Sequence, residues 1–92
     1  MAKTIWKFMP QLDEDNAAIA TVEMPIGARV LTAREQGNEL CLWAEVDPSA
    51  ATEMRSFQVF GTGHEMPDVI GAYVGTAMLY SGKLVLHVYA TN

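Results

Sequence analysis

Four consecutive residues, Gly61-Thr62-Gly63-His64, are of types that readily contact a ligand. Glycines let the backbone take positive φ values and leave its N–H groups uncovered. Uncovered N–H groups can cradle an anion, and a threonine hydroxyl can add a further hydrogen bond. Arg55 lies on the strand expected to lead into this turn and would clamp a phosphate. We therefore predict a small-anion site here, against two alternatives, a purely structural turn and a solvated strand arginine.

An aromatic side chain, Trp43, completes the predicted ligand-binding set of Arg55, Thr62, Gly63, His64 and Trp43. A nucleobase that stacks on a Trp ring gains about 1–3 kcal/mol. The alternative is that Trp43 packs in the core, as a Trp within an apolar strand often does. The sequence leaves its orientation open.

The chain holds few groups for catalysis or for metal binding. His64 and His87 are the only side chains that titrate near neutrality without perturbation. His87 alternates with apolar strand residues, which indicates a partly buried, hydrogen-bonded ring whose orientation stays open. No nucleophile-elbow, zinc-protease or long phosphate-loop motif is present. We predict no catalytic residue, no metal and no cofactor. A hydrolase that uses His64 with Glu65 is the least favoured of three functional hypotheses, after a ligand-binding protein and a protein-interaction module.

The single cysteine, Cys41, excludes an intrachain disulfide and a cysteine-rich zinc site. Its neighbours Leu40 and Leu42 are apolar, so we expect the thiol to be a small buried hydrophobe rather than a reactive nucleophile.

Length and composition set further limits. The 92 residues suffice for one domain, residues 1–92. A net charge of −5, from 11 acidic and 6 basic residues, argues against a protein that coats duplex nucleic acid. Half of the residues are apolar, which excludes a disordered chain, yet no run reaches the roughly 18 apolar residues of a membrane span. Because Lys3 and Lys7 interrupt the first apolar stretch, we expect no signal peptide and a cytoplasmic protein.

Short stretches rich in β-branched and aromatic residues, separated by Gly, Pro, Asn and Asp, predict strands. They lie at residues 4–8, 19–24, 29–34, 39–46, 55–60, 70–80 and 84–89, with residues 11–16 and 47–53 as loops. Two hairpins are clear, one at Gln36-Gly37-Asn38 and one at residues 80–83. These six or seven short strands predict an all-β fold, a compact antiparallel sandwich or partly open barrel.

Two features of this sheet follow from its pattern. The connections are too short to carry crossover helices, so we expect no parallel pairing. Gly71 and Gly75 indicate a bulge or the close approach of another backbone. A sheet of this size has free edges, and a free edge readily pairs with a second copy, so we expect a homodimer.

Several segments in a fixed order carry a family resemblance. Lys-Thr-Ile-Trp-Lys-Phe stands at residues 3–8, Met-Pro-x-Gly-Ala at 24–28, Cys-Leu-Trp-Ala-x-Val-Asp-Pro at 41–48 and Arg-x-Phe-x-Val-x-Gly-Thr-Gly-His at 55–64. Tyr73, Gly75 and Thr76 and the run at 85–88 extend the match over nearly the whole chain. In these segments the sequence resembles a family of small phage and prophage proteins.

Within phage proteins of this type, the chain is similar to sponges that sequester cyclic nucleotide signals of host antiphage immunity, including an anti-CBASS group. The resemblance implies a cytoplasmic protein of an infected or lysogenic bacterial host, in which a dimer encloses a cyclic nucleotide and breaks no bond. The second reading is a protein-interaction module that blocks a host or phage partner through a sheet edge or an apolar patch.

Overall fold

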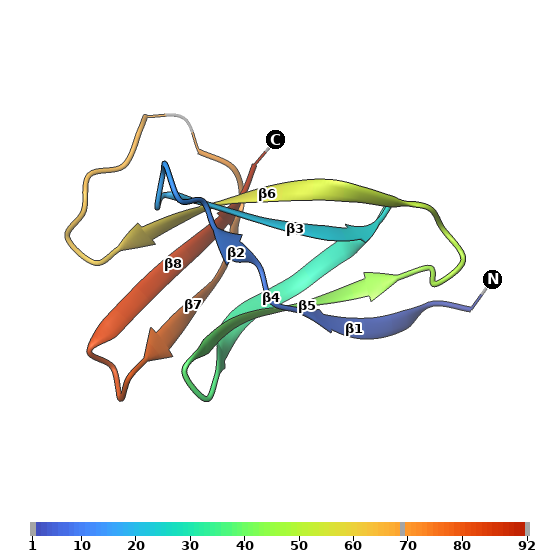
Figure 1. The fold of residues 1–92 in the computed structure, drawn as a ribbon, viewed down its shortest axis with the longest axis horizontal. Coiled ribbons are helices and arrows are strands. Elements are labelled where there is room, and N and C mark those ends of the chain that lie inside the picture. Colours follow the sequence, from blue (N-terminus) through green and yellow to red (C-terminus); the bar gives the residue numbers. More distant parts are fainter. Residues whose placement is uncertain (1, 69, 92) are drawn as a thin grey trace.

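A computed structural model describes residues 2–68 and 70–91 and contains eight strands and no helix in that part of the chain. Figure 1 shows these strands curled into a half-barrel. Their bounds are β1 Thr4–Phe8, β2 Gln11–Leu12, β3 Ile19–Pro25, β4 Arg29–Gln36, β5 Glu39–Val46, β6 Thr52–Gly61, β7 Tyr73–Leu79 and β8 Leu84–Ala90. The predicted all-β class and the partly open barrel are confirmed.

One sheet contains all eight strands in the order β1-β5-β4-β7-β8-β6-β3-β2. The two edge strands, β1 and β2, are nevertheless neighbours in sequence, joined only by Met9 and the buried Pro10. Proline has no N–H to donate to a ladder, which ends β1 at this corner. The chain therefore passes from one edge of the sheet directly to the other, and this link brings the edges of the half-barrel toward each other.

The prediction that no strands pair in parallel is wrong. β4 and β7 run parallel and pair at Ala33 and Gly75, although no helix connects them. The chain instead returns through β5 and β6, which lie elsewhere in the same sheet (Figure 1). The predicted close approach at Gly75 is confirmed, because a Cβ on this residue would lie 2.3 Å from the carbonyl oxygen of Ala33. We call this contact the parallel seam.

Two side chains hold the parallel seam together beyond its single pair. A carboxylate oxygen of Glu35 accepts the N–H of Met78 at 2.8 Å, and the Asn38 side-chain oxygen accepts the N–H of Tyr80 at 3.1 Å. The two accepting residues, Glu35 and Asn38, lie on the β4–β5 hairpin, and the two donating residues lie in or next to β7. These side chains stand in for the backbone ladder where the strands diverge.

The core lies on the concave face of the sheet. β5 shows the alternation that builds it, since Leu40, Leu42, Ala44 and Val46 are buried in the core cluster. Phe57, Val59 and Val88 join them from β6 and β8. Cys41 points to the opposite face and is also completely buried, which confirms its predicted role as a small hydrophobe. No buried polar side chain occurs among the described residues.

The strand boundaries differ most from the prediction at three places, and elsewhere by at most two residues. Residues 11–12, expected in a loop, pair with β3 as β2. β6 begins at Thr52 rather than at residue 55, because residues 52–54 pair with the end of β3. β7 begins at Tyr73 rather than at residue 70, and a Cβ on Gly71 would lie 1.5 Å from the carbonyl oxygen of Ala90. Across the described residues, no helix is long and apolar enough to cross a membrane.

Candidate functional site

The predicted ligand turn, residues 61–64, is a tight turn closed by its own backbone. The N–H of His64 donates to the carbonyl of Gly61 at 3.1 Å, and Gly63 has φ of +87°. A positive φ at the third position is the requirement of a type II turn. Gly61 does not have a positive φ, and its open side is covered by the His64 ring, because a Cβ there would lie 2.7 Å from Cε1 of that ring. The turn is therefore partly covered by its own imidazole.

Thr62 uses its hydroxyl within the protein. Thr62 Oγ1 lies 2.8 Å from Nε2 of His87, and Nδ1 of the same ring lies 3.1 Å from Oγ1 of Thr76. The Tyr73 hydroxyl lies 2.5 Å from that Thr76 oxygen and extends the row. His87 is half-buried and hydrogen-bonded at both nitrogens, which confirms the prediction for this ring. The sequence did not pair it with Thr62, because the contact depends on β6, β8 and β7 lying side by side.

Arg55 does not reach the turn, which corrects the predicted clamp. It lies on β6, seven residues before Thr62, which at about 3.3 Å per residue places it about 23 Å away. Its guanidinium donates to the carbonyl of Ala28 at 3.1 Å and lies 6.0 Å from the centre of the Phe57 ring. Arg55 therefore serves the packing between β6 and the β3–β4 turn.

Trp43, the remaining predicted residue, lies on the convex face of β1, β5 and β4, opposite to the core residues of β5. It is half-buried, with Lys7 of β1 directly across on one side and Thr32 of β4 on the other. Arg34 lies diagonally from it, opposite Cys41. We call this surface the Trp43 face; its charged and polar members are Lys3, Lys7, Arg29, Thr32, Arg34, Gln36, Glu39 and Glu45.

Four of the six Lys and Arg residues of the chain, Lys3, Lys7, Arg29 and Arg34, lie on the Trp43 face. They stand against two carboxylates, Glu39 and Glu45, in a protein of net charge −5. This concentration is not visible in the sequence, because the cations are up to 31 residues apart and meet only through the order β1-β5-β4. The Trp43 face therefore carries a local positive charge, opposite in sign to the net charge of the protein.

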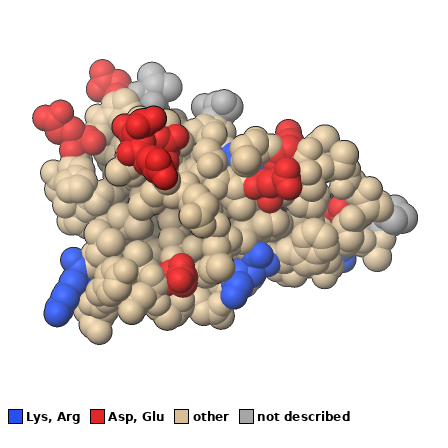
Figure 2. All heavy atoms as spheres, viewed as in Figure 1, with Lys and Arg blue, Asp and Glu red and all other residues tan. Residues whose placement is uncertain are grey.

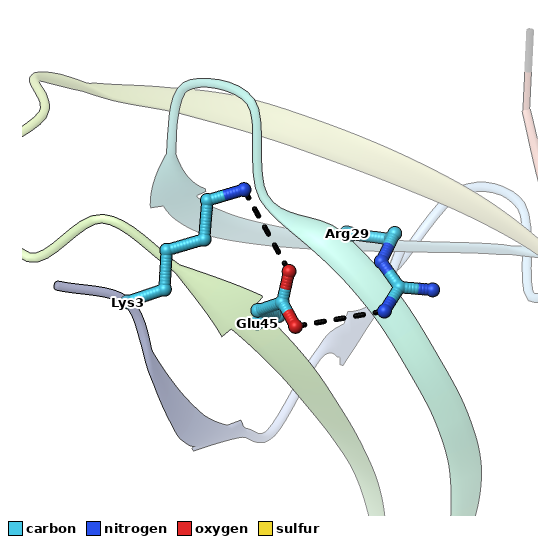
Figure 3. A network of polar contacts seen from close by, with 3 residues as sticks. All are labelled: Lys3, Arg29 and Glu45. Carbon is cyan, nitrogen blue, oxygen red and sulfur yellow. Dashed lines mark ion pairs between the residues drawn. The ribbon is translucent and has the colours of Figure 1, made fainter. Parts of the chain in front are cut away.

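The cations of the Trp43 face have weak partners. Glu45 lies between Lys3 at 3.7 Å and Arg29 at 3.5 Å, and both cationic side chains are largely exposed (Figure 3). Arg34 lies 3.8 Å from Glu35, and Lys7 Nζ donates to the Gln36 side-chain oxygen at 2.5 Å. Exposed ion pairs contribute about 0–1 kcal/mol each. An incoming anion can therefore replace them at little cost.

The two perturbed carboxyl groups have structural causes. The N–H of Met78 bonded to Glu35 holds the pKa of that carboxyl below its usual range. The hydroxyl and the N–H of Ser49 lower the pKa of Asp47 in the same way. In the part of the chain that the structure describes, no three His, Cys, Asp or Glu side chains group as metal ligands.

Two adjoining pockets open at the end of the half-barrel, with volumes of about 370 and 360 Å³. Leu12, Leu84 and Leu86 form the wall that they share. We call the pair the barrel mouth. Its first pocket is also lined by Ala17, Ala18, Val59, Phe60, Gly61, His64 and Glu65, and its second by Pro10, Gln11, Asn38, Glu39, Leu40, Leu79 and Tyr80.

Comparison with known proteins identifies a family but no activity. No curated protein and no solved structure matches the chain. One family model matches it, over residues 1–92, and is described as Domain of unknown function (DUF7352). Because the match spans the whole chain, the protein belongs to the family of the Domain of unknown function (DUF7352).

Proposed function

We propose that this protein is a non-catalytic binding protein that sequesters a small anionic ligand, a cyclic nucleotide in the first instance, on the Trp43 face. The observation that carries the proposal is the gathering of four of six cations around one half-buried tryptophan in an acidic protein. The proposal keeps Trp43 from the predicted set and replaces Arg55 by Lys7 and Arg34 as the phosphate-binding side chains.

The chemistry of this face suits a nucleotide. A base stacked on the accessible part of the Trp43 ring would gain about 1–3 kcal/mol. Lys7 lies directly opposite that ring and Arg34 diagonally, so both are within reach of phosphates attached to a stacked base. The Thr32 hydroxyl, opposite on β4, offers a hydrogen bond to the sugar or base. These groups bind and orient a ligand, and none of them is paired with a nucleophile.

A thermal-shift panel of cyclic di- and oligonucleotides tests the proposal. A ligand at 100 times its Kd adds about 2.7 kcal/mol to stability, which for a domain of this size raises Tm by about 10–20 °C. The bound ligand should be recovered intact after the protein is heated, whereas turnover would indicate a hydrolase. If none of the cyclic nucleotides shifts Tm, the proposed nucleotide sequestration is wrong.

Matched variants locate the site. Charge-assisted hydrogen bonds contribute about 1.5–3 kcal/mol, so Lys7→Met and Arg34→Gln should each weaken a hit by about tenfold or more. Lys83→Gln removes a cation from the tip of the β7–β8 hairpin and should leave the affinity unchanged. Equal losses in all three variants would indicate a general effect of net charge rather than a site at Trp43.

A homodimer in the cytoplasm of a bacterial host remains part of the proposal. The free edges are β1 and β2, and the first four residues of β1 are exposed. Pairing through β1 would extend the Trp43 face into a second copy. Sedimentation measurements across a concentration series would detect the dimer. A mass that stays at that of the monomer at every concentration would show that the proposed homodimer is wrong.

The second candidate function, a protein-interaction module, is favoured by the exposed Leu12 and Leu84 side chains in the barrel mouth. It predicts that a partner protein binds there. As the sole function, without ligand binding on the Trp43 face, it predicts that no cyclic nucleotide shifts Tm.

A further inference from the structure

We infer that the barrel mouth is a docking site for a protein segment that carries large apolar side chains next to Lys or Arg residues. This inference stands apart from ligand binding on the Trp43 face. It rests on the protein-interaction candidate and deepens it by naming the chemistry of the partner.

The apolar part of the barrel mouth is accessible. Leu12 and Leu84, in the wall shared by the two pockets, are 48% and 41% exposed, and Tyr80 beside them is 54% exposed. Scattered single exposed apolar residues are ordinary, but here several exposed apolar side chains share one hollow, which offers a partner a place to bury apolar anchors. Two adjoining pockets offer room for two anchor side chains, and burial of each aliphatic anchor contributes about 1.5–3 kcal/mol.

The rim of the barrel mouth is acidic. Glu65 lines the first pocket. Asp13, Glu14 and Asp15 lie in the loop that joins the lining residues at positions 12 and 17. Acidic side chains gather over the β2–β3 and β6–β7 loops at the upper left of Figure 2.

Few cations offset these carboxylates. Of the six Lys and Arg residues, four lie on the Trp43 face and Arg55 bonds to the carbonyl of Ala28, which leaves Lys83 next to the mouth. A field of one sign selects partners of the opposite sign and repels others. Fatty acids and anionic lipid head groups are therefore disfavoured, and a second copy docked mouth to mouth would bring two acidic rims together. A basic segment with apolar anchors would place its apolar side chains against the leucines of the shared wall and its Lys or Arg side chains near the acidic rim.

Three synthetic peptides of one length test the inference. The first carries two Leu anchors flanked by Lys, the second has Glu in place of Lys, and the third keeps Lys but has Ser in place of Leu. Amide chemical-shift titrations should give binding of the first peptide, with shifts centred on the residues of the barrel mouth. The other two peptides should bind at least about tenfold more weakly than the first. The affinity of the first peptide should fall as the salt concentration rises.

Variants separate this site from the Trp43 face. Leu84→Ser and Glu65→Lys should each weaken the first peptide by about tenfold, while both should keep any cyclic-nucleotide shift of Tm. Met54→Ser, at a 67% exposed residue of β6 outside the mouth, is the matched apolar control, and Lys7→Met is the control on the Trp43 face. Equal binding of the Glu and Lys peptides, shifts away from the mouth, or no binding of the Lys peptide at millimolar concentration would each overturn the inference.

Discussion

The parallel seam between β4 and β7 joins β1-β5-β4 to the other five strands of the sheet, and Gly75→Ala perturbs it directly. The new Cβ would lie 2.3 Å from the Ala33 carbonyl oxygen and 2.7 Å from the Ala33 nitrogen. Ordinary contacts of a Cβ lie at 3.4–4 Å, so the two strands must part by about 1 Å. Both colliding atoms belong to the backbone of a central strand and cannot rotate away.

The cost of this substitution follows from its geometry. Overpacking of a close-packed interior costs about 1–3 kcal/mol, and the upper end applies here because backbone must move. The loss of glycine's freedom in the unfolded chain returns about 0.4–1 kcal/mol. A net loss of about 2 kcal/mol lowers Tm by about 8–16 °C in a domain of this size.

Gly61→Ala is the matched control for this experiment. Its Cβ would also collide, at 2.7 Å, but with the ring of His64, which is an exposed side chain that can swing aside. We expect a change within about 0.5 kcal/mol. Urea unfolding followed by tryptophan fluorescence measures both variants. If Gly75→Ala is as stable as Gly61→Ala, the Ala33–Gly75 contact is not what holds the seam, and the reasoning fails.

Three further predictions use the same unfolding assay. The pKa of Glu35 is lower in the folded protein than in the unfolded chain. The stability that Glu35 contributes is therefore complete above its unfolded pKa and is lost as the pH falls through its folded pKa. Glu35→Gln should flatten the acid limb of the stability profile, and an acid limb as steep as that of the unsubstituted protein would contradict this. Thr62→Val removes a hydrogen bond to His87 and should cost about 0.5–1.5 kcal/mol, while Thr62→Ser should cost less; equal losses would indicate that the bond contributes nothing. Cys41 is completely buried and should react with an aromatic disulfide reagent only through opening of the fold, so the reaction should be faster in Gly75→Ala and no faster in Gly61→Ala.

The local structure of this protein could be predicted from its sequence. The strands Thr4–Phe8 and Glu39–Val46 have the predicted bounds, because their alternation of apolar and polar residues depends only on nearest neighbours along the chain. The same alternation put Leu42 and Trp43 on opposite faces of the strand, but only the structure decided which of these faces is the core. Cys41 was assigned correctly because its neighbours are apolar on both sides.

The order of the strands, and with it the candidate sites, was decided by the tertiary structure. Lys7, Trp43 and Arg34 belong to three different strands, and only the order β1-β5-β4 brings them together. Arg55 precedes the glycine turn on one strand, yet an extended strand separates residues by about 3.3 Å each, so nearness in sequence became distance in space. Alternation along a strand is a local property, whereas strand order depends on contacts such as Ala33 with Gly75 that no short segment contains.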